Sequence, residues 1–201
     1  MTSEEREPMP SEPMPSEVTS EVNRDDSPEV DAVLQTAIRE IEAHAAEPGW
    51  DQPARLYALV PTSDLLAREP QLAAAMGIDE TSAAGALTPV EQDQTPADRT
   101  LEQTLEQIMW PAEVFGCAAV VERLVLPPGS DEAIPEDAAA AEEFAASHPD
   151  RQEVRIVAGA TREGATYCAL RLKSHDDDMS VVESADLVPA LLQLLLSTLE
   201  H

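Results

Sequence analysis

The charged pair Glu122 and Arg123 is the least ordinary feature of this sequence, because it interrupts the otherwise apolar run Phe115–Leu126. General acid–base catalysis needs a carboxylate or an imidazole within hydrogen-bond reach of a substrate. If the fold brought this pair together with Asp51 and His148, the four side chains could form a catalytic site of unfamiliar type. The simpler interpretation is that Glu122 and Arg123 form ordinary ion pairs at the edge of a sheet.

Other polar residues add candidates but no catalytic motif. Glu91, Asp93 and Asp150 could also do acid–base chemistry, yet the chain has no nucleophile elbow, P-loop, GxGxxG or HExxH sequence. Asp176–Asp178 lacks the alternating ligand spacing of a calcium loop, and no Cys/His spacing suggests zinc. We therefore expect no cofactor and no metal, and the sequence leans against an enzyme.

The two tryptophans are notable because aromatic residues make up only 3% of the chain. Trp50 precedes the first predicted strand, and Trp110 precedes the central one. We expect them to anchor the ends of the sheet. Alternatively they line a groove for a partner, since Trp is enriched at binding hot spots. The candidate binding residues are Trp50, Asp51, Trp110, Glu122 and Arg123.

The charge balance restricts the classes of partner. With 40 acidic and 12 basic residues the formal net charge is −28, so the chain should be repelled by nucleic acid and by anionic membranes. The longest apolar stretch, Leu187–Leu196, is too short to span a bilayer and contains Pro189. No secretory signal is visible, and Cys117 and Cys168 fit buried reduced thiols. We therefore expect a cytoplasmic protein.

The sequence divides into a tail and one domain. Residues 1–27 contain the tandem repeat EPMPS–EPMPS and are dominated by Glu, Pro and Ser. Such a segment buries too little apolar surface to offset the entropy of ordering it, so we predict a disordered acidic tail. Residues 28–201 are predicted to form a single α+β domain.

Hydrophobic periodicity and capping signals predict nine elements within this domain. The expected helices are Pro28–Ala45, Leu65–Met76, Leu101–Met109, Pro135–Ser147 and Val188–Leu199, and the expected strands are Arg55–Val60, Phe115–Leu126, Val154–Ala158 and Tyr167–Lys173. Residues 78–99 are predicted to be a loop.

The resulting order is α-β-α-α-β-α-β-β-α, in which the second helix, Leu65–Met76, is expected to be split or kinked at Pro70. One hairpin and no regular βαβ repeat favour an α+β fold with a mostly antiparallel sheet of about four strands and helices packed on one face. The face of the hairpin that carries Arg155 and Arg171 is expected to be solvated.

Several segments together resemble an actinobacterial protein family without a known activity. They are GWDQPARLYALV (Gly49–Val60), LTPVEQ (Leu87–Gln92), WPAEVFGCAAVVERLVLPP (Trp110–Pro128), HPDRQEVR (His148–Arg155), ALRLK (Ala169–Lys173) and LVPALL (Leu187–Leu192). The resemblance implies an actinobacterial, cytoplasmic origin. It implies no ligand and no functional residue.

Two functional hypotheses follow. The leading one is a non-enzymatic protein-binding protein, an adaptor or a chaperone-like protein, because catalytic motifs are missing and the layout is reminiscent of secretion-chaperone-like folds. The alternative is the enzyme that would use Glu122, Arg123, Asp51 and His148.

The last predicted helix adds an expectation about partners. Its apolar residues lie almost all round its circumference: Leu187, Val188, Leu191, Leu192, Leu194, Leu195, Leu196 and Leu199. A helix that is apolar on nearly every side must be covered on nearly every side. We therefore predict a homodimer or a protein partner that contacts this helix.

Overall fold

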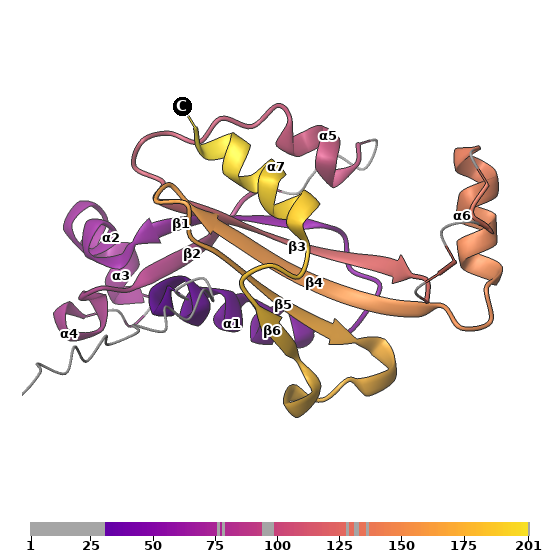
Figure 1. The fold of residues 1–201 in the computed structure, drawn as a ribbon. Coiled ribbons are helices and arrows are strands. Elements are labelled where there is room, and N and C mark those ends of the chain that lie inside the picture. The colour runs from indigo at the N-terminus through magenta and orange to yellow at the C-terminus, as the bar shows by residue number, and fades with distance from the viewer. Residues whose placement is uncertain are drawn as a thin grey trace, which may run out of the picture.

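The structure is a computed structural model, and it describes residues 31–75, 77, 79–93, 99–127, 129–130, 133–135 and 137–200. The predicted tail, residues 1–27, lies outside the described residues. The described chain forms one antiparallel sheet of six strands with helices on it (Figure 1). The α+β class is as predicted.

The predicted strand number and element order are wrong. The sheet has six strands rather than about four, in the order β2 (Leu87–Glu91), β1 (Arg55–Pro61), β3 (Gly116–Val125), β4 (Gln152–Thr161), β5 (Thr166–Leu172) and β6 (Val182–Ser184). Strand β2 lies in the segment predicted to be a loop, where Pro89 hides the strand signal, and β6 has only three residues. The sequence of helices and strands is α-β-α-α-α-β-α-β-α-β-β-β-α, apart from two 3-10 turns, Lys173–His175 and Asp178–Ser180.

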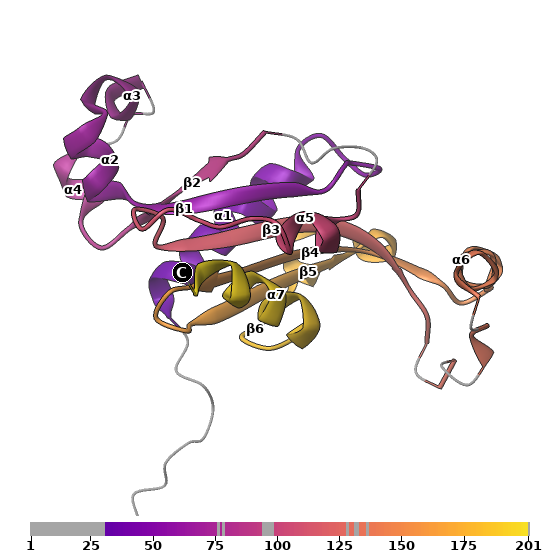
Figure 2. The ribbon, with the colours of Figure 1, turned by 90° about the horizontal axis from the view of Figure 1, so that it is seen from above.

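Helices cover both faces of the sheet, not one. Helix α1 (Ala32–Ala46) lies on one face, capped by Asp31, whose side chain accepts from the backbone N–H groups of Val33 and Leu34 at 2.8 and 3.1 Å. Helices α5 (Leu101–Leu105) and α7 (Pro189–Leu199) lie on the opposite face (Figures 1 and 2). The reason is the composition of the central strands, which are apolar on both sides and so need two covers.

Side-chain alternation along β3 assigns neighbouring residues to opposite layers. Glu122 is paired with Arg155 of β4, and Arg123 with Val154. Val154 belongs to the core under α7, whereas Val120, two residues before Glu122, belongs to the core under α1. Glu122 and Arg123 therefore lie on different faces.

Smaller helices surround the sheet. Helices α2 (Thr62–Arg68), α3 (Pro70–Ala75) and α4 (Glu80–Ala83) connect β1 to β2, and α3 begins at Pro70 as predicted. The β3–β4 hairpin extends away from the other strands, with α6 (Ala138–Ser147) at its far end (Figure 1).

Candidate functional site

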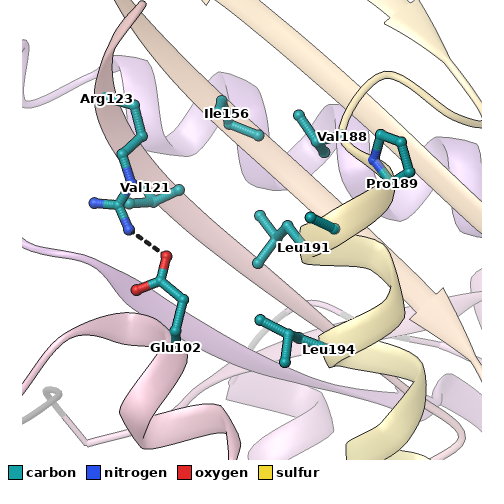
Figure 3. Close-up of a pocket in the computed structure, with 9 residues that line it drawn as sticks. Glu102, Val121, Arg123, Ile156, Val188, Pro189, Leu191 and Leu194 are labelled. Carbon is teal, nitrogen blue, oxygen red and sulfur yellow. Dashed lines mark hydrogen bonds and ion pairs between the residues drawn. The ribbon is translucent and has the colours of Figure 1, made fainter. Parts of the chain in front are cut away.

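An open apolar groove lies beside the first half of α7. It has a volume of about 360 Å³. Its lining residues come from α5, β3, β4 and the beginning of α7: Glu102, Val121, Arg123, Ile156, Val188, Pro189, Ala190, Leu191 and Leu194 (Figure 3). Seven of these nine carry aliphatic side chains or proline, so the groove offers a largely apolar surface.

Local sequence signals explain why the groove stays open. The capping box of Thr100 and Gln103 starts α5, but the helix ends after five residues at Leu105. Pro189 occupies the first turn of α7, as Pro prefers, and fixes where that helix begins. Two short helices cannot cover a face whose strands β3 and β4 are each ten residues long. The floor is formed by Val121 and Ile156, which are buried, and the more accessible wall is formed by the partly buried Leu191 and Leu194.

One ion pair forms the polar rim of the groove. Arg123 donates from Nη2 to Oε1 of Glu102 at 2.7 Å, and both side chains are nearly half exposed. Burial raises the pKa of Glu102, but hydrogen bonds from the backbone and from Arg123 outweigh it, so the net pKa is lowered. The pair is thus charged at neutral pH and joins α5 to β3.

A second, polar cluster lies on the opposite face around Trp50. Glu122 accepts from the backbone N–H groups of Asp51 and Gln52 at 2.8 and 3.3 Å, and from Nη2 of Arg155 at 2.8 Å. Asp51 has a φ of 65°, a left-handed conformation that is uncommon for residues other than glycine. The turn is therefore built around the carboxylate of Glu122.

Trp50 covers this cluster. The guanidinium carbon of Arg155 lies 4.5 Å from the centroid of the Trp50 ring, and Nζ of Lys173 lies 5.6 Å from it. The indole N–H donates to Asp176 at 2.8 Å. These contacts are cation–π interactions and one hydrogen bond, which fix the ring in place.

A neighbouring buried ion pair extends the polar cluster toward α1. Arg171 donates to the two carboxylate oxygens of Glu42 at 2.6 and 2.9 Å, and to Asp178 at 2.9 Å. The hydrogen bond to Glu42 raises the pKa of Arg171. Arg155 and Arg171 are 1% and 3% exposed, so the prediction of a solvated hairpin face is wrong. The partners that make this burial tolerable are Glu122 and Glu42.

The chemistry of the polar cluster is structural. Most of its acids and bases pair with one another: Lys173, for example, donates to Glu153 at 2.5 Å and lies 3.7 Å from Asp51. An exception is Nη1 of Arg155, which is buried without a hydrogen-bond partner among the described residues. A general acid or base needs free access to a substrate proton. Within the described residues, no group of three or more His, Cys, Asp or Glu side chains could hold a metal ion.

The structure brings together three of the five predicted binding residues. Trp50, Asp51 and Glu122 meet in the polar cluster. Arg123 lies at the groove, on the other face. Trp110 is buried under α7, where its indole N–H donates to Thr198 at 3.0 Å.

The four residues of the catalytic alternative are spread over three places. Asp51 contacts Glu122, Arg123 pairs with Glu102, and His148 caps the end of α6. The ring of His148 packs against Phe144 and accepts from the N–H of Asp150 at 3.2 Å. Glu91 accepts from the hydroxyl of Tyr57 at 3.3 Å.

The sequence singles out the groove residues of the last helix, among them Leu191 and Leu194, but not those of the two strands, Val121 and Ile156. Leu191 and Leu194 are only half buried, although their spacing resembles that of core residues. The relevant sequence feature is the excess of leucine around α7, which predicts that a second copy or a protein partner covers this helix. The cysteines lie where expected: Cys117 and Cys168 are buried and not disulfide-bonded, and burial raises the pKa of Cys117 to about 11.

Comparison with known proteins assigns the chain to a family but indicates no activity. The model of the PPA1309-like protein family matches residues 34–200. The chain belongs to this family. No curated protein and no solved structure matches it significantly. Among the described residues, no helix has both the length and the apolar character needed to cross a membrane.

Proposed function

We propose that this member of the PPA1309-like family is a non-enzymatic protein-binding protein, an adaptor or chaperone-like protein, and that the groove beside α7 receives its partner. The observation that carries the proposal is the open apolar groove with a single ion pair in its lining. A concave, mostly apolar surface with a few polar groups is typical of binding sites.

The incomplete helix layer favours a protein as the occupant. Helix α1 covers its face as one continuous helix of 15 residues, whereas the other face is covered by two separate helices, α7 with 11 residues and α5 with five, and the groove lies between them. A helix supplied by another protein would complete the second layer and bury the partly exposed side chains of Val188, Leu191 and Leu194, as amphipathic helices do in other apolar grooves. We further propose that the protein acts in the cytoplasm of an actinobacterium, which the sequence resemblance and the two reduced thiols support.

The proposal is tested by site-specific crosslinking in cells of the natural host. A photoreactive p-benzoylphenylalanine replaces Ala190, which is exposed and lines the groove, in an otherwise unchanged full-length chain. The same group in place of Gln193, which is exposed but does not line the groove, is the matched control. We expect one discrete crosslinked protein from position 190 only, lost when Leu191→Asp is added.

Equal labelling at positions 190 and 193, or labelling that persists with Leu191→Asp, would contradict the proposal. Native mass spectrometry of the purified protein provides an independent check. A stoichiometric small molecule that is released by Leu191→Asp would show that the groove is a ligand pocket instead.

A further inference from the structure

We infer that the partner segment is a basic amphipathic helix, which places aliphatic side chains in the groove and a lysine or arginine on Glu102. This inference rests on the proposed function and adds the chemistry of the partner. Three observations carry it: the helical ridge on α7, the charge of the chain around the groove, and the exposed ion pair at the rim.

The shape of the wall suits a helix. Leu191 and Leu194 of α7 are three residues apart and both line the groove, and Val188, which precedes the first helical residue, lines it too (Figure 3). Side chains at this spacing form a ridge along a helix, and a second helix packs its own side chains beside such a ridge. The matching partner has aliphatic residues at positions i, i+3 or i+4, and i+7.

The charge of the chain selects a basic partner. Residues 31–200 carry 31 acidic and ten basic side chains. All ten basic side chains already bond to groups of the chain itself: Arg39, Arg55, Arg68, Arg99, Arg123, Arg151, Arg155, Arg162, Arg171 and Lys173. An acidic segment would therefore be repelled, because the surface is strongly anionic and its lysine and arginine side chains already bond to groups of the same chain. A basic segment would be attracted.

Carboxylates lie at the groove and near both of its flanks. Glu102 lines it, and Glu106, one helical turn later, is exposed. On the α7 side, Asp186 is exposed just before the helix begins. Glu102 uses Oε1 for Arg123, and a carboxylate can accept about four hydrogen bonds, so it can take a partner's cation without releasing Arg123.

The test uses two synthetic peptides with identical leucine positions at i, i+4, i+7 and i+11. One carries lysine and arginine on its polar face, and the other carries glutamate at the same places. Fluorescence anisotropy with the full-length chain measures both dissociation constants at low and moderate salt. We expect the basic peptide to bind at least about tenfold more tightly, with an advantage that shrinks as salt screens the charges.

Three variants assign the contacts. Leu191→Asp should abolish binding of the basic peptide, and Glu102→Gln combined with Glu106→Gln should weaken it about fivefold or more. Gln193→Glu, which adds a negative charge on the other flank of α7, should leave the affinity within about twofold. Circular dichroism melting curves verify that each variant is folded.

The outcomes separate this inference from the proposed function. Equal binding of the two peptides, or no effect of the paired Glu→Gln changes while Leu191→Asp abolishes binding, overturns the basic helix but leaves the groove as a docking site. Failure of both peptides to bind also overturns the inference, and the crosslinking experiment then decides on the docking site separately. Equal weakening by Leu191→Asp and Gln193→Glu would overturn both.

Discussion

The two faces of the sheet differ in how helices cover the central strands. The α1 face is closed by one long helix and by buried ion pairs, in which Arg155 and Arg171 are almost inaccessible. The α7 face is covered by two separate helices, and an apolar groove with a buried floor of Val121 and Ile156 lies between them. Charged side chains are thus buried on one side of the sheet, and an apolar groove opens on the other.

This difference shows that charged residues adjacent in the sequence need not belong to one site. Glu122 and Arg123 are neighbours in the sequence, but one holds a turn together and the other borders the groove. A buried ion pair costs the desolvation of both charges, so it persists only where its geometry is well satisfied. The reactive-looking cluster is therefore part of the scaffold, and the apolar groove is the candidate for binding.

The largest expected effect comes from breaking the buried pair on the α1 face. Arg171→Ala leaves Glu42 buried without its partner, so we expect the free energy of unfolding to fall by about 3–5 kcal/mol. The double variant Glu42→Met/Arg171→Met removes both charges and should lose less than either single Met variant. Urea denaturation measures all of them. A double variant that is less stable than both single variants would contradict this account.

The next effect concerns the stacked tryptophan. Trp50→Ala removes the cation–π contact with Arg155 and the hydrogen bond to Asp176, and should lower the free energy of unfolding by about 1–2 kcal/mol. Trp50→Phe, which keeps an aromatic ring, serves as the control and should lose about half as much. Thermal denaturation followed by circular dichroism distinguishes the two. If both variants lose the same free energy of unfolding, Trp50 stabilises the fold only through the hydrogen bond of its indole N–H.

Groove variants should separate stability from binding. Leu191 is half buried, so Leu191→Asp should cost no more than about 1 kcal/mol of unfolding free energy while it removes the proposed binding surface. The comparison is with Leu195→Asp, one turn later but fully buried, which should unfold the domain. If Leu191→Asp is as damaging as Leu195→Asp, the groove residues belong to the core.

A smaller, pH-dependent effect is expected at the Arg39–Glu183 pair. Its hydrogen bond from Arg39 lowers the pKa of Glu183 below the ordinary value of 4.5. Because the folded pKa is depressed, the contribution of the pair is fully present above the unfolded pKa and is lost as the pH falls through the folded one. Glu183→Gln should therefore make stability less dependent on pH below about 4.5. Melting temperatures from pH 3 to 6 would show an unchanged acid limb if the pair contributes nothing.

The smallest expected effect is that of the N-terminal segment. Residues 1–27 are predicted to bury no apolar surface, so their deletion should leave the melting temperature of the domain unchanged within about 1 °C. Differential scanning calorimetry of the full chain and the shortened chain provides the measurement. A fall of several degrees would mean that this segment packs on the domain.

Local sequence signals predicted the elements that they control directly. The helices α1 and α7 and the β4–β5 hairpin follow hydrophobic periodicity, and α5 begins at its capping box. Strand β2 is not predicted from the sequence, because proline is uncommon in strands and Pro89 lies in its middle. The strand forms through backbone pairing with β1, which the local sequence does not reveal. Strand β6 was missed because three residues give no measurable period.

The candidate site was less predictable because its determinants are far apart in the chain. Arg171 looked solvated since its partner Glu42 lies 129 residues away. The groove depends on how short α5 is and on where α7 begins over the sheet, and neither is visible as a residue pattern. Only the excess of leucine in α7, which predicts a partner for this helix, pointed to this side of the molecule.

The margins of the sheet carry a consequence for self-association. Pro89 sits in the middle of edge strand β2 and has no backbone N–H to offer, while β6, at the opposite edge, is only three residues long. Unprotected edges are the places where β proteins polymerise into fibrils. Here neither margin can template a long added strand, and a net charge of −28 keeps copies apart. We therefore expect the described sheet to resist the addition of a further strand at either edge.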